Sequence, residues 1–368
     1  MLNMSFLNKE TITLNFWKSV DLGKSILHDA FLKKNEESKS HLEVDPMDKF
    51  ISSYGMILIA AFVNCIGVYT CAIYKRTTSK DSVLSRDEIM KVPLMLSCSL
   101  FGLFCFLKLI SVEYLTFAIQ VYSLFCGFLS LGAIFGIPLE RFWFSSLPPN
   151  RCFHFCVSEK DKDLYSVDIK YSDLVAYFVS ACIVVGYFVK KSWVLNNIVA
   201  ASFTFTLLEN ITLDRFWNSF ILFAGLFLYD IFWVYSTNVM VTVAKKIDAP
   251  LMFKLPYRTL GPEGTIKYSG LGLGDVAVPG LFLAFLARFD LSLKQKKYNY
   301  FGIGMVCYIL SLILCTMVVN YTNLGQPAFF YIVPVVFTGV LLMALKRGEM
   351  SQLLAFNAEC EEEKPKED

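Results

Sequence analysis

Histidine is scarce in this chain, and its scarcity excludes two kinds of protease chemistry. Its 368 residues include three histidines, His28, His41 and His154, and none of them lies in a long apolar run. A Ser-His protease needs a histidine as its base, and an HExxH zinc site needs two histidines on one helix. Among hydrolytic mechanisms inside the apolar part of the chain, only paired carboxylates remain.

Strong charge and a disulfide framework are also missing. The net charge is +2 with the basic residues spread along the chain, so we expect no nucleic-acid partner. Of eleven cysteines, eight lie in apolar runs, where free cysteine behaves as a small hydrophobe. Cys152, His154 and Cys156 lack the paired ligand spacing of a structural zinc site, so we interpret them as loop residues and expect neither metal nor cofactor.

What the chain has in abundance is apolar sequence. Apolar residues make up 55% of it and aromatic residues 15%, and the mean hydropathy is +0.51. Soluble domains average about 45 to 50% apolar residues, so the composition predicts an all-α polytopic membrane protein. Nine candidate spans follow a polar N-terminal segment in which we expect no cleaved signal peptide: 50–74, 92–112, 114–137, 174–189, 194–208, 217–244, 268–287, 299–319 and 327–345.

Two of the runs are short for a membrane-spanning helix, which needs about 17 to 25 residues. Runs 174–189 and 194–208 contain 16 and 15 residues. They fit either one re-entrant hairpin or two spans, and both options return the chain to the same side of the membrane.

The basic residues predict the orientation. With segments 75–91, 138–173, 209–216, 288–298 and 346–368 in the cytosol, that side holds 19 basic residues and the other side 14. The positive-inside rule then places the N-terminus outside and the C-terminus in the cytosol. Lys364 and Lys366 fit a dilysine retrieval signal to the endoplasmic reticulum (ER) or a solvated charged tail, and Asn3 begins a glycosylation sequon on the outer side.

Two aspartates lie inside these apolar runs. Asp230 lies within Phe223 to Val234, and Asp275 lies within Gly270 to Phe285. A carboxylate in hydrocarbon costs at least about 2.5 to 3.5 kcal/mol, so it normally faces a partner or water. Two carboxyl groups a few ångströms apart share one proton, so that the ionised group can deprotonate water while the protonated group polarises the scissile carbonyl. The pair therefore indicates an aspartyl protease dyad within the membrane.

The residues around Asp275 suggest room for a substrate. Gly270, Gly272 and Gly274 remove side chains from the backbone that precedes the acid. Pro279 has no N–H for the carbonyl of residue 275, so in a helix we expect that carbonyl to be free for water or substrate.

Three motifs together resemble the presenilin and signal peptide peptidase family of GxGD intramembrane aspartyl proteases. They are Tyr229-Asp230, the GxGD set Gly272-Leu273-Gly274-Asp275, and Gln326-Pro327-Ala328. The sequence that flanks the two acids resembles the signal peptide peptidase branch, and the similarity runs from about residue 50 to 350. The family's third motif reads Pro-Ala-Leu, whereas this chain has Phe329, whose larger ring we expect to narrow the site or alter inhibitor fit.

The resemblance implies a fold of nine transmembrane helices. Residues 1–49 would be luminal, 50–208 would form helices one to five, 209–345 would form catalytic helices six to nine with a luminal loop at 245–267, and 346–368 would be a cytosolic tail. The catalytic residues would be Asp230 and Asp275, supported by Tyr229, Gly272, Leu273, Gly274, Gln326, Pro327, Ala328 and Phe329.

The resemblance also implies the reaction and its place. The expected activity is cleavage of remnant signal peptides and type II membrane segments within the ER bilayer, and a homo-oligomer and ER quality-control partners are further expectations. Two alternatives keep the same acids: a proton or cation transporter, and a signal-sequence-binding chaperone without turnover.

The loop 245–267 suggests how a helical substrate is held when it unwinds. Leu251, Phe253 and Leu255 alternate between two prolines, and 265–268 can pair back after a turn. We predict that a substrate induces β-pairing here, because unpaired backbone in lipid costs several kcal/mol per group. The alternative is an ordinary linker.

Overall fold

The computed structural model describes most of the chain between residues 43 and 358. The described residues are 43–44, 46–74, 83–109, 112–142, 151–159, 162–236, 250–260, 266–293, 299–322 and 324–358. They belong to two compact units, one formed by 1–49 with 257–267 and the other by 50–256 with 268–368. Segments 50–208 and 209–345 fall in the second unit, apart from residues 257–267. Asn3, Lys364 and Lys366 lie outside the described residues.

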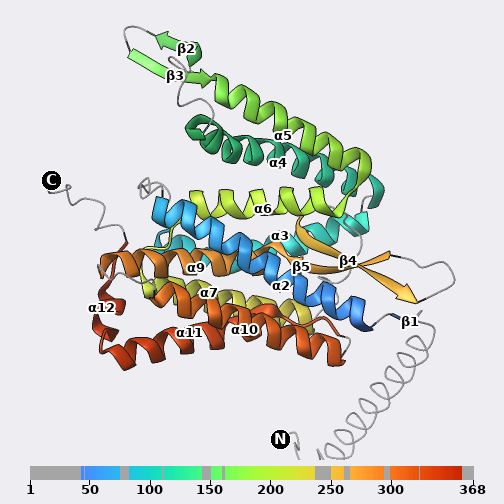
Figure 1. Cartoon of the computed structure of the whole chain (residues 1–368), viewed down its shortest axis with the longest axis vertical. Coiled ribbons are helices and arrows are strands. Elements are labelled where there is room, and N and C mark those ends of the chain that lie inside the picture. Colours follow the sequence, from blue (N-terminus) through green and yellow to red (C-terminus); the bar gives the residue numbers. More distant parts are fainter. Residues whose placement is uncertain are drawn as a thin grey trace, which may run out of the picture. The chain divides into compact units, whose positions relative to one another are not determined.

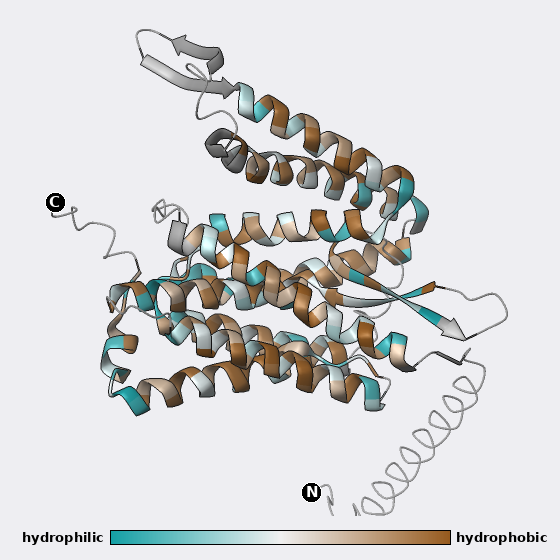
Figure 2. Ribbon diagram, viewed as in Figure 1, coloured by the Kyte–Doolittle hydropathy of each residue, from teal (hydrophilic) through white to brown (hydrophobic). Residues whose placement is uncertain are grey.

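Each of the nine apolar runs forms a helix in the part of the chain that is described, and Figure 2 shows how apolar these helices are. The helices are α2 (Pro46–Val68, continued by the π-helical η1, Tyr69–Tyr74), α3 (Arg86–Leu109), α4 (Val112–Phe142), α5 (Tyr171–Lys190), α6 (Trp193–Asn210), α7 (Phe216–Ile231, continued by the π-helical η3, Phe232–Ser236), α9 (Leu273–Ser292), α10 (Asn299–Thr322), α11 (Ala328–Arg347) and the short α12 (Met350–Ala355). The runs 174–189 and 194–208 are thus two separate helices.

Seven of these helices are long and apolar enough to cross a membrane: α2, α3, α4, α5, α7, α10 and α11. Many of their large apolar side chains face outward, among them Leu58, Phe178 and Leu342, as expected where lipid is the solvent. By contrast α6 is short and has polar residues at both ends, and α9 contains three charged residues. The nine-span topology therefore stays a prediction.

The chain is mostly helical, as expected, but five strands accompany the helices in the part that the structure describes. Strands β1 (Glu43–Val44), β4 (Met252–Leu260) and β5 (Ile266–Gly272) form one sheet in the order β1-β4-β5, in which Glu43 pairs with Leu260. Strands β2 (Arg151–Glu159) and β3 (Lys162–Lys170) form an antiparallel pair. The segment from Cys152 to Cys156 is therefore strand, not loop.

The seventh apolar run begins as strand and becomes helix only at Leu273. Its first five residues, 268–272, belong to β5, which we had assigned to the span. Gly270 and Gly272 explain the difference, since glycine is about 1 kcal/mol less favourable than alanine inside a helix. The predicted loop 245–267 correspondingly contains β4 and the beginning of β5.

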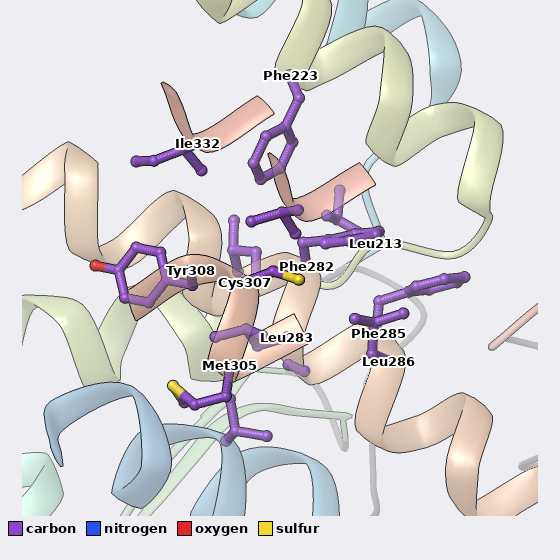
Figure 3. Packing of buried hydrophobic residues seen from close by; sticks show 14 of the residues in the cluster. Leu213, Phe223, Phe282, Leu283, Phe285, Leu286, Met305, Cys307, Tyr308 and Ile332 are labelled. Carbon is purple, nitrogen blue, oxygen red and sulfur yellow. The ribbon is translucent and has the colours of Figure 1, made fainter. Parts of the chain in front are cut away.

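Helix α9 is the core helix of the second unit. It contacts α6, η1, α10 and α11, and Figure 1 shows it among the other helices. Most of its residues are buried, as expected for a helix whose apolar residues are not confined to one face. The ring of Phe282 lies 5.7 Å from Phe223 of α7 and 4.7 Å from Phe337 of α11 between ring centroids. Figure 3 shows Phe223 and Phe282 in this packing, which fixes α7, α9 and α11 together.

Helices α2 and α6 begin at the same level of the second unit. The Ser52 hydroxyl of α2 donates to the Leu255 carbonyl at 2.9 Å, and the Asn196 amide of α6 donates to the Met252 carbonyl at 2.7 Å. Both helices therefore begin at the first half of β4.

Three segments of the chain meet at the other end of α6. Val83, just before α3, bridges to Thr212, which follows α6, and the Ala358 N–H donates to the Asp214 carbonyl at 2.9 Å. Segments 75–91, 209–216 and 346–368, all predicted to be cytosolic, thus meet.

Candidate active site

Asp230 lies near the end of α7 and is 5% exposed. Its Oδ2 accepts the backbone N–H of Phe329 at 3.1 Å. Phe329 lies in the first turn of α11, after Pro327 at the N-cap, where N–H groups have no partner within the helix. The positive end of the α11 dipole therefore also faces this carboxyl group.

Asp275 is the third residue of α9 and is only partly buried. The N–H of Gly272, the N-cap residue, hydrogen-bonds its carboxylate. A carboxylate at the third helical position that bonds the N-cap N–H is the reciprocal half of a capping box. The GxGD spacing thus follows from helix-capping geometry.

Gly272 leaves the space that this contact needs. A Cβ atom at residue 272 would lie 3.0 Å from Oδ2 of Asp275, closer than ordinary van der Waals contact, whereas a Cβ at Gly274 would meet nothing within 4 Å. The first glycine of the motif therefore accommodates the carboxylate, and the second has open space where a side chain would stand.

The two aspartates approach each other across α7 and α9. The helices that carry them pack together, with Phe223 of α7 5.7 Å from Phe282 of α9 between ring centroids. Helix α11 contacts both α7 and α9, so one helix end contributes to the surroundings of the pair. The arrangement can divide acid and base roles between two carboxyls in an apolar core. Among the residues that the structure describes, no cluster of three or more His, Cys, Asp or Glu side chains could hold a metal.

A family model described as signal peptide peptidase matches residues 75–360. The chain belongs to the signal peptide peptidase family. It is 32% identical to the signal peptide peptidase of Homo sapiens over 325 residues, which cover 86% of this chain and 85% of that protein. It is also 32% identical to the signal peptide peptidase of Mus musculus over 325 residues, which cover 86% of this chain and 84% of that one. Intramembrane protease 2 of Caenorhabditis elegans is 37% identical over 205 residues, covering 52% of this chain and 44% of that protein.

The remaining motif residues lie around the two acids in different ways. The ring of Tyr229 lies 6.5 Å from that of Trp233 on the same helix, which favours a packing role. Leu273 donates its N–H to the Leu251 carbonyl at 3.1 Å and thereby ties the first turn of α9 to the segment before β4. Gln326 accepts the Tyr331 hydroxyl at 3.4 Å, and Ala328 is buried as the first residue of α11.

Phe329 replaces the leucine of the family motif. The hydrogen bond that it makes to Asp230 comes from its backbone N–H. Its ring packs edge-on against Phe223, with 5.9 Å between ring centroids. Phe223 lies two helical turns before Asp230. The effect of this ring on the site stays a prediction, but the contact to the carboxylate does not depend on the side chain.

The strands at 252–272 are already paired in the free chain, so the idea that a substrate induces them needs correction. Strand β4 is held from α6 by Asn197, whose amide donates to the Lys254 carbonyl at 2.8 Å and accepts the Lys254 N–H at 2.8 Å. In this part of β4, Asn197 pairs with the backbone on one edge and β5 pairs on the other, so both edges are hydrogen-bonded. Strand β5 forms the end of the sheet and leads directly into Asp275.

Two further residues at Asp275 escaped the sequence analysis. The Tyr308 hydroxyl on α10 donates to the Asp275 carbonyl at 2.9 Å, and the Asn64 amide on α2 donates to the Val276 carbonyl at 3.0 Å. The carbonyl expected to be free for water or substrate therefore has a protein partner. A buried amide within the apolar run 50–74 was the available signal for Asn64, while Tyr308 is one aromatic residue among many.

Proposed function

We propose that the protein is an intramembrane aspartyl endopeptidase whose catalytic residues are Asp230 and Asp275. The observation that carries the proposal is a pair of carboxyl groups on two helices that pack together, each bonded to a backbone N–H at a helix N-terminus, inside a core of apolar helices. The names of the human, mouse and nematode relatives support peptidase activity within a membrane.

In the proposed reaction the two acids divide the work. One carboxylate takes a proton from a water molecule, and the protonated partner donates a hydrogen bond to the scissile carbonyl. The water oxygen attacks the carbonyl carbon while the carbonyl oxygen takes the partner's proton, which gives a tetrahedral intermediate. The carboxyl group that took the water proton then gives it to the amide nitrogen and the C–N bond breaks, while the partner carboxylate regains a proton from a hydroxyl of the intermediate. Asp230 has its fixed partner in the Phe329 N–H, and Gly274, the residue before Asp275, has open space where a Cβ would stand, which leaves room for a substrate backbone.

The proposed substrate is a transmembrane helix that unwinds at the site. Its freed backbone groups would pair with the outer edge of β5, since α6 and β5 occupy the edges of β4 at residues 252 to 254. Pairing at β5 would guide the extended segment toward Asp275, because the strand continues into α9. Hydrogen bonds to the strand would offset the cost of bare backbone in lipid.

The substrate class we propose is remnant signal peptides and type II membrane segments in the ER membrane. The proposed topology has nine spans, a luminal N-terminus and a cytosolic C-terminus. Its support is the positive-inside count, together with the meeting of segments 75–91, 209–216 and 346–368 at one end of the bundle. Homo-oligomers and ER quality-control partners remain part of the proposal.

The test uses detergent-purified full-length protein and a synthetic signal peptide, with the products analysed by mass spectrometry. Cleavage inside the apolar core of the peptide, lost in both Asp230→Ala and Asp275→Ala, is the expected result. Specific binding of the peptide without cleavage would instead indicate a chaperone. If neither binding nor cleavage occurs, proton flux in reconstituted vesicles tests the transporter alternative.

A further inference from the structure

Pro279 creates a specific difficulty in the helix that carries Asp275. It is the seventh residue of α9, and it has no N–H to donate to the carbonyl four residues earlier, which is that of Asp275. Its ring also pushes against that carbonyl. The backbone of the proposed catalytic residue is therefore deprived of its normal helical hydrogen bond within the apolar core.

Tyr308 supplies the missing donor from a neighbouring helix. Its side chain is fully buried on α10, and its hydroxyl donates to the Asp275 carbonyl at 2.9 Å. Figure 3 shows the Tyr308 ring beside other residues of the buried cluster. A hydrogen bond between α9 and α10 thus replaces the hydrogen bond that the Asp275 carbonyl would make within α9. The backbone of Asp275 is therefore fixed to α10.

The next carbonyl is held in a similar way from α2. Asn64, which is fully buried, donates its amide to Val276, and a Cβ at Gly280 would lie 2.5 Å from Asn64 Oδ1. Gly280 therefore allows α2 to come close to α9 at the proline. Two successive carbonyls at the start of α9 thus have side-chain donors from two different helices.

We propose that Tyr308 is a positioning residue of the reaction. By replacing the N–H that Pro279 lacks, it fixes the backbone of Asp275 and hence the place of the Asp275 carboxyl relative to that of Asp230. The inference rests on the proposed protease function. Tyr308 bonds the backbone of Asp275, so it acts through that residue rather than on the substrate.

The first test is Tyr308→Phe, which removes one oxygen atom and keeps the ring. A shift of the carboxyl by a fraction of an ångström should lower kcat about tenfold, because a misplacement of about 1 Å can cost about a hundredfold. KM should stay unchanged, since the strands that receive the substrate are untouched. The matched control is Tyr300→Phe on the same helix, which changes another fully buried tyrosine, one whose hydroxyl donates to Glu349 at 2.6 Å. There kcat should stay at the wild-type value.

The second test is a double-mutant cycle with Pro279→Ala. Alanine restores an N–H at residue 279, which can bond the Asp275 carbonyl directly. Tyr308→Phe should therefore cost much less kcat in the Pro279→Ala background than in the wild type. A purely structural role of Tyr308 in core packing would give the same loss in both backgrounds.

The outcomes separate this inference from the proposed function. If the wild type does not cleave the peptide, or if Asp275→Ala still does, the protease proposal fails. If the wild type cleaves and Asp275→Ala does not, yet Tyr308→Phe matches Tyr300→Phe in kcat, only the role of Tyr308 is overturned. An equal loss of kcat from Tyr308→Phe in the wild-type and Pro279→Ala backgrounds also overturns the role of Tyr308. If Pro279→Ala is itself inactive, the comparison of kcat between Tyr308→Phe and Tyr300→Phe decides whether Tyr308 positions Asp275.

Discussion

Replacing Gly272 by alanine should displace the Asp275 carboxyl without harming the fold. The backbone at residue 272 has φ −61° and ψ 142°, which any L-residue adopts, so the substitution introduces no backbone strain. The new Cβ would lie 3.0 Å from Oδ2 and 3.6 Å from Cγ of Asp275, whereas ordinary contacts begin at about 3.4 Å. The carboxyl must therefore move by about 0.4 Å.

That displacement sets the expected loss of activity. If a misplacement of about 1 Å costs about a hundredfold, a shift of about 0.4 Å should lower kcat about sixfold. This corresponds to about 1 kcal/mol of transition-state stabilisation. The thermal unfolding temperature should change little, because Gly272 is only partly buried.

Gly274→Ala is the matched control in the same motif. Its Cβ meets nothing within 4 Å in the free chain, so it should leave the unfolding temperature and the Asp275 carboxyl unchanged. Any effect should arise only when substrate enters, and it should raise KM more than it lowers kcat. Both variants are compared with wild type by initial rates of peptide cleavage over a range of substrate concentrations. An undiminished kcat in Gly272→Ala would refute the contact between residue 272 and the carboxylate.

Three further predictions concern the acid, the strand and the third motif. Asp275→Glu should lower the cleavage rate about a hundredfold while the protein remains inserted in the membrane, because one more methylene moves the carboxyl by about an ångström. Near-normal turnover would argue against a pair of carboxyl groups held in fixed positions. Asn197→Ala should destabilise the first half of β4 by about 1 to 3 kcal/mol, seen as faster hydrogen exchange of the Lys254 amide, because two hydrogen bonds to Lys254 are lost. Asn210→Ala, at the exposed end of the same helix, is its control and should leave that exchange unchanged. Phe329→Leu should lower the free energy of unfolding by about 1 kcal/mol, because packing on Phe223 is lost. The variant should still cleave the peptide, since the contact to Asp230 comes from the backbone. An inactive but folded variant would mean that the ring itself shapes the site.

The sequence by itself determined the membrane class, the helical runs and the two acids. Long apolar runs leave few alternatives to helices, because every backbone polar group in lipid must be paired. Asp230 and Asp275 stand out for a similar reason, since a carboxyl group in such a run is costly unless it has a partner. The glycines of the GxGD motif were also visible, although sequence alone could not say which of them the carboxylate requires.

Only the tertiary structure decided how the site is held together. The strands at 252–272 were partly missed because Gly270 and Gly272 interrupt an apolar run whose hydropathy is that of a span. The Phe329 N–H, the Tyr308 hydroxyl and the Asn64 amide reach the site from residues 33 to 212 positions away from their partners. No local pattern specifies such contacts, because they depend on how α2, α10 and α11 pack around α7 and α9. The chain thus specifies its acids locally, while packing between helices fixes their geometry.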